Sequence, residues 1–303
     1  MLKSCTRRWR RYSFGALKSN ATILSLALGW ICVSFATARA VIPPSEWHWA
    51  AIHGHRIYYT VRGGGPTLVF LHGGGDSGEH SFVRQLTLFS EHHHVVAPDQ
   101  VGQGHTPDVP GPLSYTAMMQ DTAALLRLLN LKHVDVVGFS DGGILALMLA
   151  VRHPELVHRL VISGVNIAPE GLNPAALEEL RASQIPEPKT IDEKLAHLWL
   201  TSPTEIELSL PLLAKIAQPV LVISGDRDAI TLEHTLQIFH ALPNAELCVL
   251  PGTDHATFSG RSDGLAQPDH QGLSRSPRRR RMINAYSRNR RSRKNRVVHR
   301  EWS

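Results

Sequence analysis

Residues 136–143 have the sequence Val136-Val137-Gly138-Phe139-Ser140-Asp141-Gly142-Gly143. An apolar run from His133 to Phe139 predicts a strand, and a helical pattern begins directly after the stretch, at Ile144. A serine in so tight a turn is held in a strained backbone conformation, and its neighbours must be very small. The stretch therefore predicts a serine hydroxyl lifted above a sheet, beside the N–H groups that open a helix. The alternative is an ordinary tight turn, since glycine and serine are common residues.

Strand and helix patterns alternate along residues 41–259. A hairpin with alternating polar residues is predicted over residues 47–61. Further strands are predicted at residues 67–71, 95–97, 133–139, 160–163, 219–223 and 245–250, and helices at 80–92, 115–131, 144–153 and 232–242. Such alternation favours a mostly parallel sheet with right-handed crossovers and helices on both faces. The predicted fold class is therefore α/β.

This alternation stops between about residues 166 and 213. The stretch is rich in proline and contains helical patterns at about 175–182 and 191–200. Because it is inserted after a strand, we expect it to lie over the serine as a small helical cap that excludes water. The alternative is an exposed connection, but several apolar side chains argue against it: Leu198, Trp199, Leu200, Leu208, Leu210, Leu212 and Leu213.

Acidic and basic partners for the serine are present later in the chain. A serine hydroxyl is a weak nucleophile unless a base accepts its proton and an acid orients that base. Asp226 and Asp228 follow one predicted strand, and His255 follows the last predicted strand. The carboxyl ends of parallel strands meet at one edge, so these side chains should gather near Ser140. On the residues alone both carboxylates are candidates, and the alternative for Asp226 is a turn cap within its own loop.

The sequence from Val41 to Ser259 resembles the α/β-hydrolase superfamily, in its serine-esterase branch. The resemblance rests on four motifs: His72-Gly73-Gly74-Gly75, Gly138-Phe139-Ser140-Asp141-Gly142-Gly143, Gly225-Asp226-Arg227-Asp228 and Pro251-Gly252-Thr253-Asp254-His255. Within the superfamily, residues 140–143 are most similar to those of the valacyclovirase or biphenyl-hydrolase-like group.

The resemblance implies roles for particular residues. It implies a catalytic triad of Ser140, His255 and Asp228, the acid being the second carboxylate of its loop. It also implies an oxyanion hole formed by the backbone N–H groups of Asp141 and Gly74. A serine at position 140 argues against dehalogenases and epoxide hydrolases, which resemble this fold but carry aspartate there.

These residues predict hydrolysis of an ester or related acyl bond in a small molecule, through an acyl-enzyme on Ser140. No cofactor is expected, since no nicotinamide, flavin or phosphate loop is found and Gly63–Gly65 is interpreted as a hairpin turn. Two alternatives remain open. The same triad could cleave a carbon–carbon bond, or the chain could be an inactive, damaged product.

The side chain of Asp141 has two interpretations. An ionised carboxylate directed into the acyl pocket would attract a cationic substrate, such as an α-ammonium ester, so Asp141 is a candidate substrate-binding residue. The resemblance to the valacyclovirase group points the same way. The alternative is a carboxylate that bonds backbone at the head of its helix, where it meets the positive end of the helix dipole.

Charge is distributed unevenly over the 303 residues, whose formal net charge is +6. Residues 1–40 carry seven Lys or Arg and no acid, and residues 260–303 carry thirteen Lys or Arg against three acids. The centre, residues 41–259, therefore has a net charge of −11. The chain is an acidic globule with two basic ends.

The N-terminal end has the features of a cleavable signal peptide. A basic region reaches Lys18, an apolar stretch follows, and Ala38-Arg39-Ala40 has the small-x-small form of a cleavage site. We expect cleavage after Ala40, a secreted or periplasmic protein, and membrane contact only during export. The alternative, a retained anchor, would need an apolar stretch of about 20 residues.

The C-terminal end, residues 260–303, shows no amphipathic helix and contains clustered arginine, as in Pro277-Arg278-Arg279-Arg280-Arg281. It has three interpretations: a nucleic-acid-binding arm, a disordered solvated tail, or translation out of frame after Ser259. We favour the frame error and expect no nucleic-acid partner. Without a closing helix, apolar sheet surface should be exposed, and the chain should be poorly soluble or marginally stable.

Other reactive side chains are given structural roles. Cys248, in a predicted strand, is interpreted as a small core residue. No His or Cys spacing resembles a metal site. The consecutive residues His92-His93-His94 point in different directions, so we do not expect them to bind one metal ion together. His234, on a predicted helix, is expected at the surface.

Overall fold

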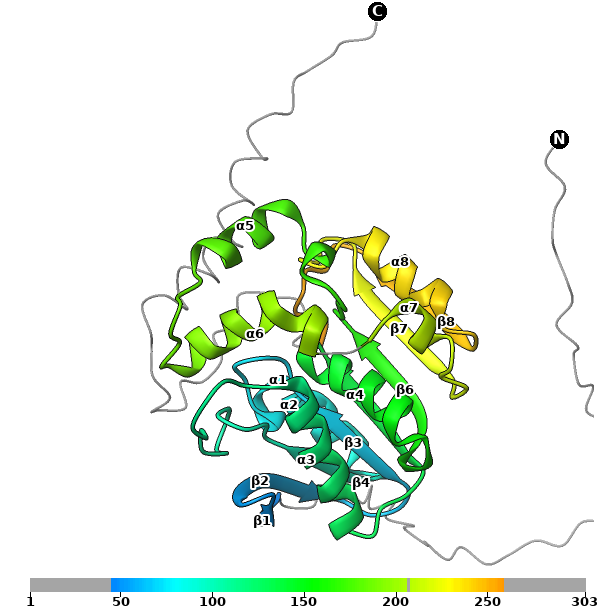
Figure 1. Cartoon of the computed structure of the whole chain (residues 1–303). Helices are drawn as coiled ribbons and strands as arrows, with labels where there is room; N and C mark the ends of the chain where they lie inside the picture. The colour runs from blue at the N-terminus through cyan, green and yellow to red at the C-terminus, as the bar shows by residue number, and fades with distance from the viewer. Residues whose placement is uncertain (1–44, 206–207, 259–303) are drawn as a thin grey trace, which may run out of the picture. The chain divides into compact units, whose positions relative to one another are not determined.

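The computed structural model describes residues 45–205 and 208–258 of the chain (Figure 1). The side chains of residues 202–205 are not described. The predicted signal peptide, residues 1–40, and the predicted basic tail, residues 260–303, lie outside the described residues.

In the described part of the chain, eight strands form one sheet in the order β1-β2-β4-β3-β5-β6-β7-β8. The strands are β1 Glu46–Ile52, β2 His55–Arg62, β3 Thr67–Leu71, β4 His94–Pro98, β5 Val134–Phe139, β6 Val157–Ser163, β7 Val220–Gly225 and β8 Ala245–Leu250. β1 and β2 form the predicted antiparallel hairpin, and β2 is antiparallel to β4. All other neighbouring strands are parallel, which confirms the predicted fold class.

The loop Gly63–Gly65 is not the hairpin turn that the sequence predicts. β2 pairs with β4, and β3 pairs with the opposite edge of β4, so the loop crosses the beginning of β4. The backbone of Gly63 has a φ of 70° and lies against the carbonyl groups of Ser90 and His93. Glycine is needed there for close approach between backbones, which the sequence signal alone cannot distinguish from a hairpin.

The helices in the described residues are α1 Gly78–Ser81, α2 Val83–Phe89, α3 Tyr115–Leu128, α4 Asp141–Arg152, α5 Pro174–Ala182, α6 Ile191–Glu205, α7 Leu210–Leu213 and α8 Leu232–Ala241. Two 3₁₀ turns lie at Pro154–Leu156 and Pro169–Gly171. The helix predicted at 80–92 is broken at Phe82, where φ is −127°. α3 ends before the predicted Leu131, because Asn130 has left-handed backbone with a φ of 56°.

Two apolar clusters lie on opposite faces of the sheet. Val69 and Leu71 of β3 belong to the larger cluster, which includes the buried residues of α3 and α4. Leu68 and Phe70 alternate with them and pack with Phe82 beside α2 in the smaller cluster. Since successive side chains of a strand point to opposite faces, helices cover both faces of the sheet.

The stretch predicted to form a cap contains α5, α6 and α7. In Figure 1, α5 and α6 lie at the end of the sheet where α4 begins. Leu198 and Leu213 are buried, at 1% and 0% exposure, whereas Leu210 is 40% exposed. The ammonium group of Lys194 on α6 lies 2.8 and 2.9 Å from the two carboxylate oxygens of Asp108 and donates to the carbonyl of Val109.

The surface position predicted for His234 is wrong. His234 lies on α8 as predicted, but its side chain is buried, with Thr235 and Ile238 on the same face of the helix. Its Nε2 atom accepts a hydrogen bond of 3.1 Å from the N–H of Ile167. Burial lowers the pKa of His234 below its ordinary value of 6.5, and the hydrogen bond with Gln237 and the charge of Glu170 offset only part of this effect. The polarity of a histidine in the sequence suggests an exposed side chain, and it does not show that the ring accepts a hydrogen bond from a buried backbone N–H group.

The sheet face opposite α8 is partly open. A hollow of about 440 Å³ is lined there by apolar residues that include Phe89 on α2, Val161 on β6 and Leu221 on β7. Cys248 on β8 is only half-buried, so it is less enclosed than the core position that the sequence predicts. β8 forms the sheet edge, and Val249 beside Cys248 is exposed.

Candidate active site

Ser140 occupies the turn between β5 and α4. Its backbone has a φ of 52° and a ψ of −119°, which confirms the predicted strained conformation. The turn is fixed by a bond from the N–H of Ser140 to the carbonyl of Ser163 on the neighbouring strand, 2.8 Å. A side chain at Gly138 would meet the backbone of α4, and one at Gly142 would meet the carbonyl of Leu71. Very small neighbours are therefore required by the packing of this turn.

The structure brings Ser140, His255 and Asp228 together at the carboxyl edge of the sheet. The Nε2 atom of His255 lies 3.1 Å from the Oγ atom of Ser140. Its Nδ1 atom lies 2.6 Å from Oδ1 of Asp228, which also accepts the N–H of Ile230 at 3.0 Å. A carboxylate can only accept, so Nδ1 carries the proton and donates it to Asp228, and Nε2 is left to accept the hydroxyl proton of Ser140.

The two carboxylates of the loop after β7 have different partners. Oδ1 of Asp226 accepts the N–H of Thr253 at 3.1 Å, so Asp226 ties its loop to the one that carries His255. The alternative role of Asp226, a cap within its own loop, is therefore wrong, because the N–H group that it accepts belongs to the loop of His255. Asp254 accepts the N–H of Ala256 at 3.1 Å and caps a turn.

The electrostatic surroundings of His255 favour its protonated form. Burial lowers the pKa of the His255 imidazole, but the hydrogen bond and charge of Asp228 and the charges of Asp141 and Asp254 outweigh it. The pKa is therefore raised above its ordinary value of 6.5. A base that gains stability on protonation is suited to take a proton from Ser140.

Two further residues hold the His255 ring in place, and motif analysis gives them no role. Gly164, directly after β6, has a φ of 62°, and a side chain there would lie 2.8 Å from Cε1 of His255. The Phe139 ring lies on the ring of His255, with 5.1 Å between the ring centroids. Gly164 follows a predicted strand, which is the one sequence signal that could have drawn attention to it.

The predicted oxyanion donors are the backbone N–H groups of Gly74 and Asp141. Within residues 45–205 and 208–258, neither N–H has a protein acceptor. The loop that carries Gly74 is fixed on either side: Nε2 of His72 accepts the N–H of Gln100 at 2.9 Å, and Gly75 donates to Oε1 of Gln103 at 2.7 Å. Two available N–H groups beside a nucleophile, one in a fixed loop and one at the first residue of α4, can stabilise an oxyanion.

The Asp141 carboxylate is buried and accepts hydrogen bonds from two side chains. Oδ1 accepts the hydroxyl of Tyr115 at 2.8 Å, and both oxygens lie 3.0 Å from Nε1 of Trp199. Among the described residues it bonds no backbone group, so the backbone partner of the helix-head alternative is not found, although Asp141 does lie in the first turn of α4. Burial raises its pKa above the ordinary 3.8, although the hydrogen bonds from Trp199 and Tyr115 and the charges of His72 and His255 oppose this.

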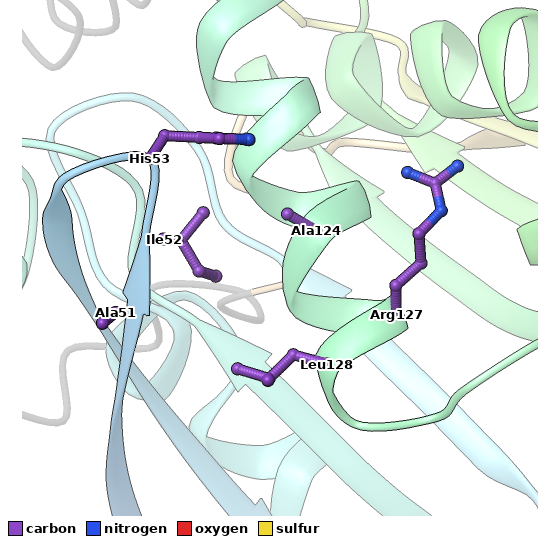
Figure 2. A pocket seen from close by; sticks show the side chains of 6 residues that line it. All are labelled: Ala51, Ile52, His53, Ala124, Arg127 and Leu128. Carbon is purple, nitrogen blue, oxygen red and sulfur yellow. The ribbon is translucent and has the colours of Figure 1, made fainter.

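Figure 2 shows a hollow of about 470 Å³ between the β1–β2 hairpin and α3. Its lining includes Ile52, Leu128 and His53, whose Nδ1 atom lies 2.6 Å from Oδ1 of Asp121. The hollow contains none of the predicted site residues, so it is not part of the candidate active site. Within the described residues, no group of three His, Cys, Asp or Glu side chains is arranged to hold a metal ion.

Comparisons with known proteins agree with the fold. Residues 66–187 match a family model described as alpha/beta hydrolase fold. Human serine hydrolase BPHL is 37% identical over 121 residues, which cover 38% of this chain and 42% of that protein. The 2-hydroxymuconate semialdehyde hydrolase of Pseudomonas putida is 35% identical over 118 residues, which cover 37% of this chain and 40% of that protein. This chain thus spans less than half the length of these relatives.

Solved structures extend the similarity to the whole described domain. The crystal structure of a hydrolase from Pseudomonas aeruginosa gives a TM-score of 0.56 at 23% identity and covers 70% of this chain and 92% of that one. At that identity the match shows the fold. The chain therefore has the α/β-hydrolase fold, and the predicted resemblance to the α/β-hydrolase superfamily is confirmed. The match to BPHL also confirms the predicted similarity to the valacyclovirase group.

Proposed function

We propose that this protein is a serine hydrolase that cleaves an ester or related acyl bond of a small molecule through an acyl-enzyme. The observation that carries the proposal is the continuous hydrogen-bonded path from Ser140 through His255 to Asp228. Beside it lie the N–H groups of Gly74 and Asp141, which have no protein acceptor among the described residues. The fold hosts many chemistries, so these placed groups carry the proposal rather than the fold.

The first half of the reaction forms the acyl-enzyme. Nε2 of His255 takes the proton of Ser140 as Oγ attacks the carbonyl carbon, and the carbonyl oxygen becomes an oxyanion. The N–H groups of Gly74 and Asp141 donate to that oxyanion, and one such donor is worth about 3–4 kcal/mol in other enzymes. His255 then gives its proton to the leaving oxygen as the bond to the acyl carbon breaks. The acyl group remains esterified to Ser140.

The second half regenerates the free serine. His255 takes a proton from a water molecule, whose oxygen attacks the acyl carbon. When the second tetrahedral intermediate collapses, the proton returns to Oγ of Ser140 and the acid product leaves. Asp228 keeps the imidazole in the required tautomer and stabilises its charge in both halves. Besides the substrate and one water molecule, these steps use side chains and backbone of this chain.

Carbon–carbon bond hydrolysis is the second candidate function. The similarity to 2-hydroxymuconate semialdehyde hydrolase favours it, and the same three side chains can support it. The two functions are separated by parallel assays with a p-nitrophenyl ester and with a vinylogous 1,5-diketone of the ring-fission type. Turnover of the diketone at a kcat/KM at least tenfold above that of the ester would favour the second candidate.

The proposed function is tested with a short p-nitrophenyl ester. Ser140→Ala should lower turnover by roughly 10⁴-fold or more, because it removes the nucleophile. Ser224→Ala is the matched control, since its buried hydroxyl donates to the carbonyl of Gly225, which is not a triad residue. Full activity in Ser140→Ala would contradict the proposal, and an inactive wild type would favour the damaged product.

Location and partners are proposals as well. We propose that the chain is exported, on the features of residues 1–40, and acts on a small molecule without a nucleic-acid partner. In the part of the chain that the structure describes, no helix is long and apolar enough to span a membrane. N-terminal sequencing of the secreted or periplasmic protein should begin at Val41. A start at Met1 would contradict cleavage.

A further inference from the structure

The carboxylate of Asp141 joins three separate elements of the fold. Asp141 is the first residue of α4, Tyr115 is the first residue of α3, and Trp199 lies on α6 of the cap. The hydroxyl of Tyr115 and the indole N–H of Trp199 both donate to this carboxylate, at 2.8 and 3.0 Å. Tyr115 is fully buried and Asp141 is 6% exposed. The contact is therefore shielded from water, where charge-assisted hydrogen bonds are strong.

The same contact borders both predicted oxyanion donors. One donor is the backbone N–H of Asp141 itself. The other belongs to Gly74, where a side chain would meet the Asp141 carboxylate and would lie 2.7 Å from Cζ2 of Trp199. The indole ring and the carboxylate thus lie directly against the Gly74 backbone. Movement of Trp199 would change the surroundings of both N–H groups.

The cap helix α6 has a second attachment that is remote from Ser140. Lys194 bonds Asp108 and the carbonyl of Val109, which belong to the loop after β4. Lys194 is buried, as Asp141 is. The molecule therefore offers two attachments of one helix, and of these two only the Trp199 attachment reaches the turn of the candidate nucleophile.

Packing alone does not account for an acid at position 141. Burial of an ionised carboxylate is costly, and here the hydrogen-bond donors are two neutral side chains. A neutral side chain of similar size would fill the same space at lower cost. The charge has an effect on the site, because Asp141 is one of the carboxylates that raise the pKa of His255.

On the basis of the proposed serine hydrolase function, we propose that Asp141 is a positioning residue whose carboxylate ties the cap helix, through Trp199, to the N–H groups of Gly74 and Asp141. The position of the cap then sets the geometry of the oxyanion donors. Donor geometry matters most in the transition state, so loss of the tie should lower kcat more than it changes KM.

Three variants separate this role from general stabilisation of the cap. Trp199→Phe keeps an aromatic ring but removes the indole N–H. Lys194→Gln, the matched control, weakens the other attachment of α6 and leaves the Asp141 contact intact. Asp141→Asn removes the charge. Each is assayed with p-nitrophenyl acetate for kcat, KM and pH dependence, with thermal melting measured alongside.

Trp199→Phe should lower kcat about tenfold with KM within about twofold, because misplaced catalytic groups act on the transition state. Lys194→Gln should keep kcat within about twofold even if its melting temperature falls. Asp141→Asn should move the acid limb of the pH profile to lower pH. Equal loss of kcat in Trp199→Phe and Lys194→Gln, or an unchanged acid limb in Asp141→Asn, would overturn the proposal.

Hydrogen exchange of the Trp199 indole N–H does not depend on catalysis, so it tests the tie separately from the hydrolase function. The chain has six tryptophans, and Trp199→Phe identifies the indole N–H signal of Trp199 in a ¹⁵N-labelled sample. That N–H should exchange slowly with solvent in the wild type and rapidly in Asp141→Ala. Rapid exchange in the wild type would overturn the tie itself. A wild type that hydrolyses no ester but shows slow exchange would overturn the hydrolase function and leave the tie supported.

Discussion

The Nε2 atom of His255 lies 3.1 Å from the Oγ atom of Ser140, although 115 positions separate the two residues in the sequence. The sheet accounts for this proximity. Ser140 follows β5 and His255 follows β8, and the strands from β5 to β8 are parallel neighbours, so their carboxyl ends share one edge. Asp228 follows β7, between them, and meets the far nitrogen of the same ring.

The pH dependence of ester hydrolysis should report the charge of His255. The free base must accept a proton, and the pKa of His255 is raised above 6.5, so kcat/KM should fall as the pH drops below that raised value. Asp228→Asn removes the carboxylate whose hydrogen bond and charge raise the pKa of His255. It should therefore move the acid limb to lower pH, besides lowering the rate. The profile is measured with p-nitrophenyl acetate in a pH-stat. An acid limb well below 6.5 in the wild type would contradict the assigned environment.

Gly164→Ala should separate activity from stability. The added methyl group would lie 2.8 Å from Cε1 of His255 and push the ring away, so kcat should fall about 10²-fold. The control is Gly54→Ala, which also introduces a side chain at positive φ, 86°, but meets no atom within 4 Å. Both variants should lose roughly 1 kcal/mol of stability from backbone strain, and only Gly164→Ala should lose activity. Equal activity in the two variants would remove Gly164 from the site.

Stability should fall in mild acid because of His234. Its pKa is lowered in the folded state, so below 6.5 the unfolded chain binds a proton that the folded chain does not yet bind. The contribution of His234 is therefore complete above 6.5 and is lost as the pH falls through the lowered pKa. His234→Gln keeps an acceptor for the N–H of Ile167 but does not titrate. Its melting temperature should change less between pH 7.5 and 5.5 than that of the wild type, and identical changes would refute the linkage.

Substrate charge is the least constrained property of the site. An Asp141 carboxylate that reached a substrate ammonium group would favour an amino-acid ester over its des-amino analogue by one to two decades, roughly 1.4–3 kcal/mol. Because Tyr115 and Trp199 already donate to this carboxylate, we expect the two esters to differ by less than about threefold. The ratio of their kcat/KM values is measured in the wild type and in Asp141→Asn. A large preference that Asp141→Asn abolishes would restore Asp141 as a substrate-binding residue.

The sequence predicts the parts of the site that lie in short motifs. Ser140, Asp228 and His255 each follow a predicted strand, and the parallel sheet alone brings such positions to one edge. Contacts that depend on packing between distant elements are not visible in this way. The bonds from Tyr115 and Trp199 to Asp141 require the relative positions of α3, α6 and α4, which no local pattern specifies.

Two other differences between expectation and structure have the same origin. His234 lies on a correctly predicted helix, but its burial depends on the chain around Ile167 that packs against it. The glycines at 63–65 correctly indicate a turn of the backbone, but strand pairing decides that the chain crosses the start of β4. Local propensity thus identifies the elements, and tertiary contacts decide which faces and edges meet.

The most direct test of the account is to map the residue that a fluorophosphonate modifies. The reagent reacts with a serine only where a base and oxyanion donors activate it. After reaction with the purified protein, proteolysis and mass spectrometry should find one adduct, on Ser140, and none in Ser140→Ala or after prior heat denaturation. Modification of a different serine, or no adduct on Ser140 in a folded sample, would contradict the proposed nucleophile and with it the serine hydrolase function.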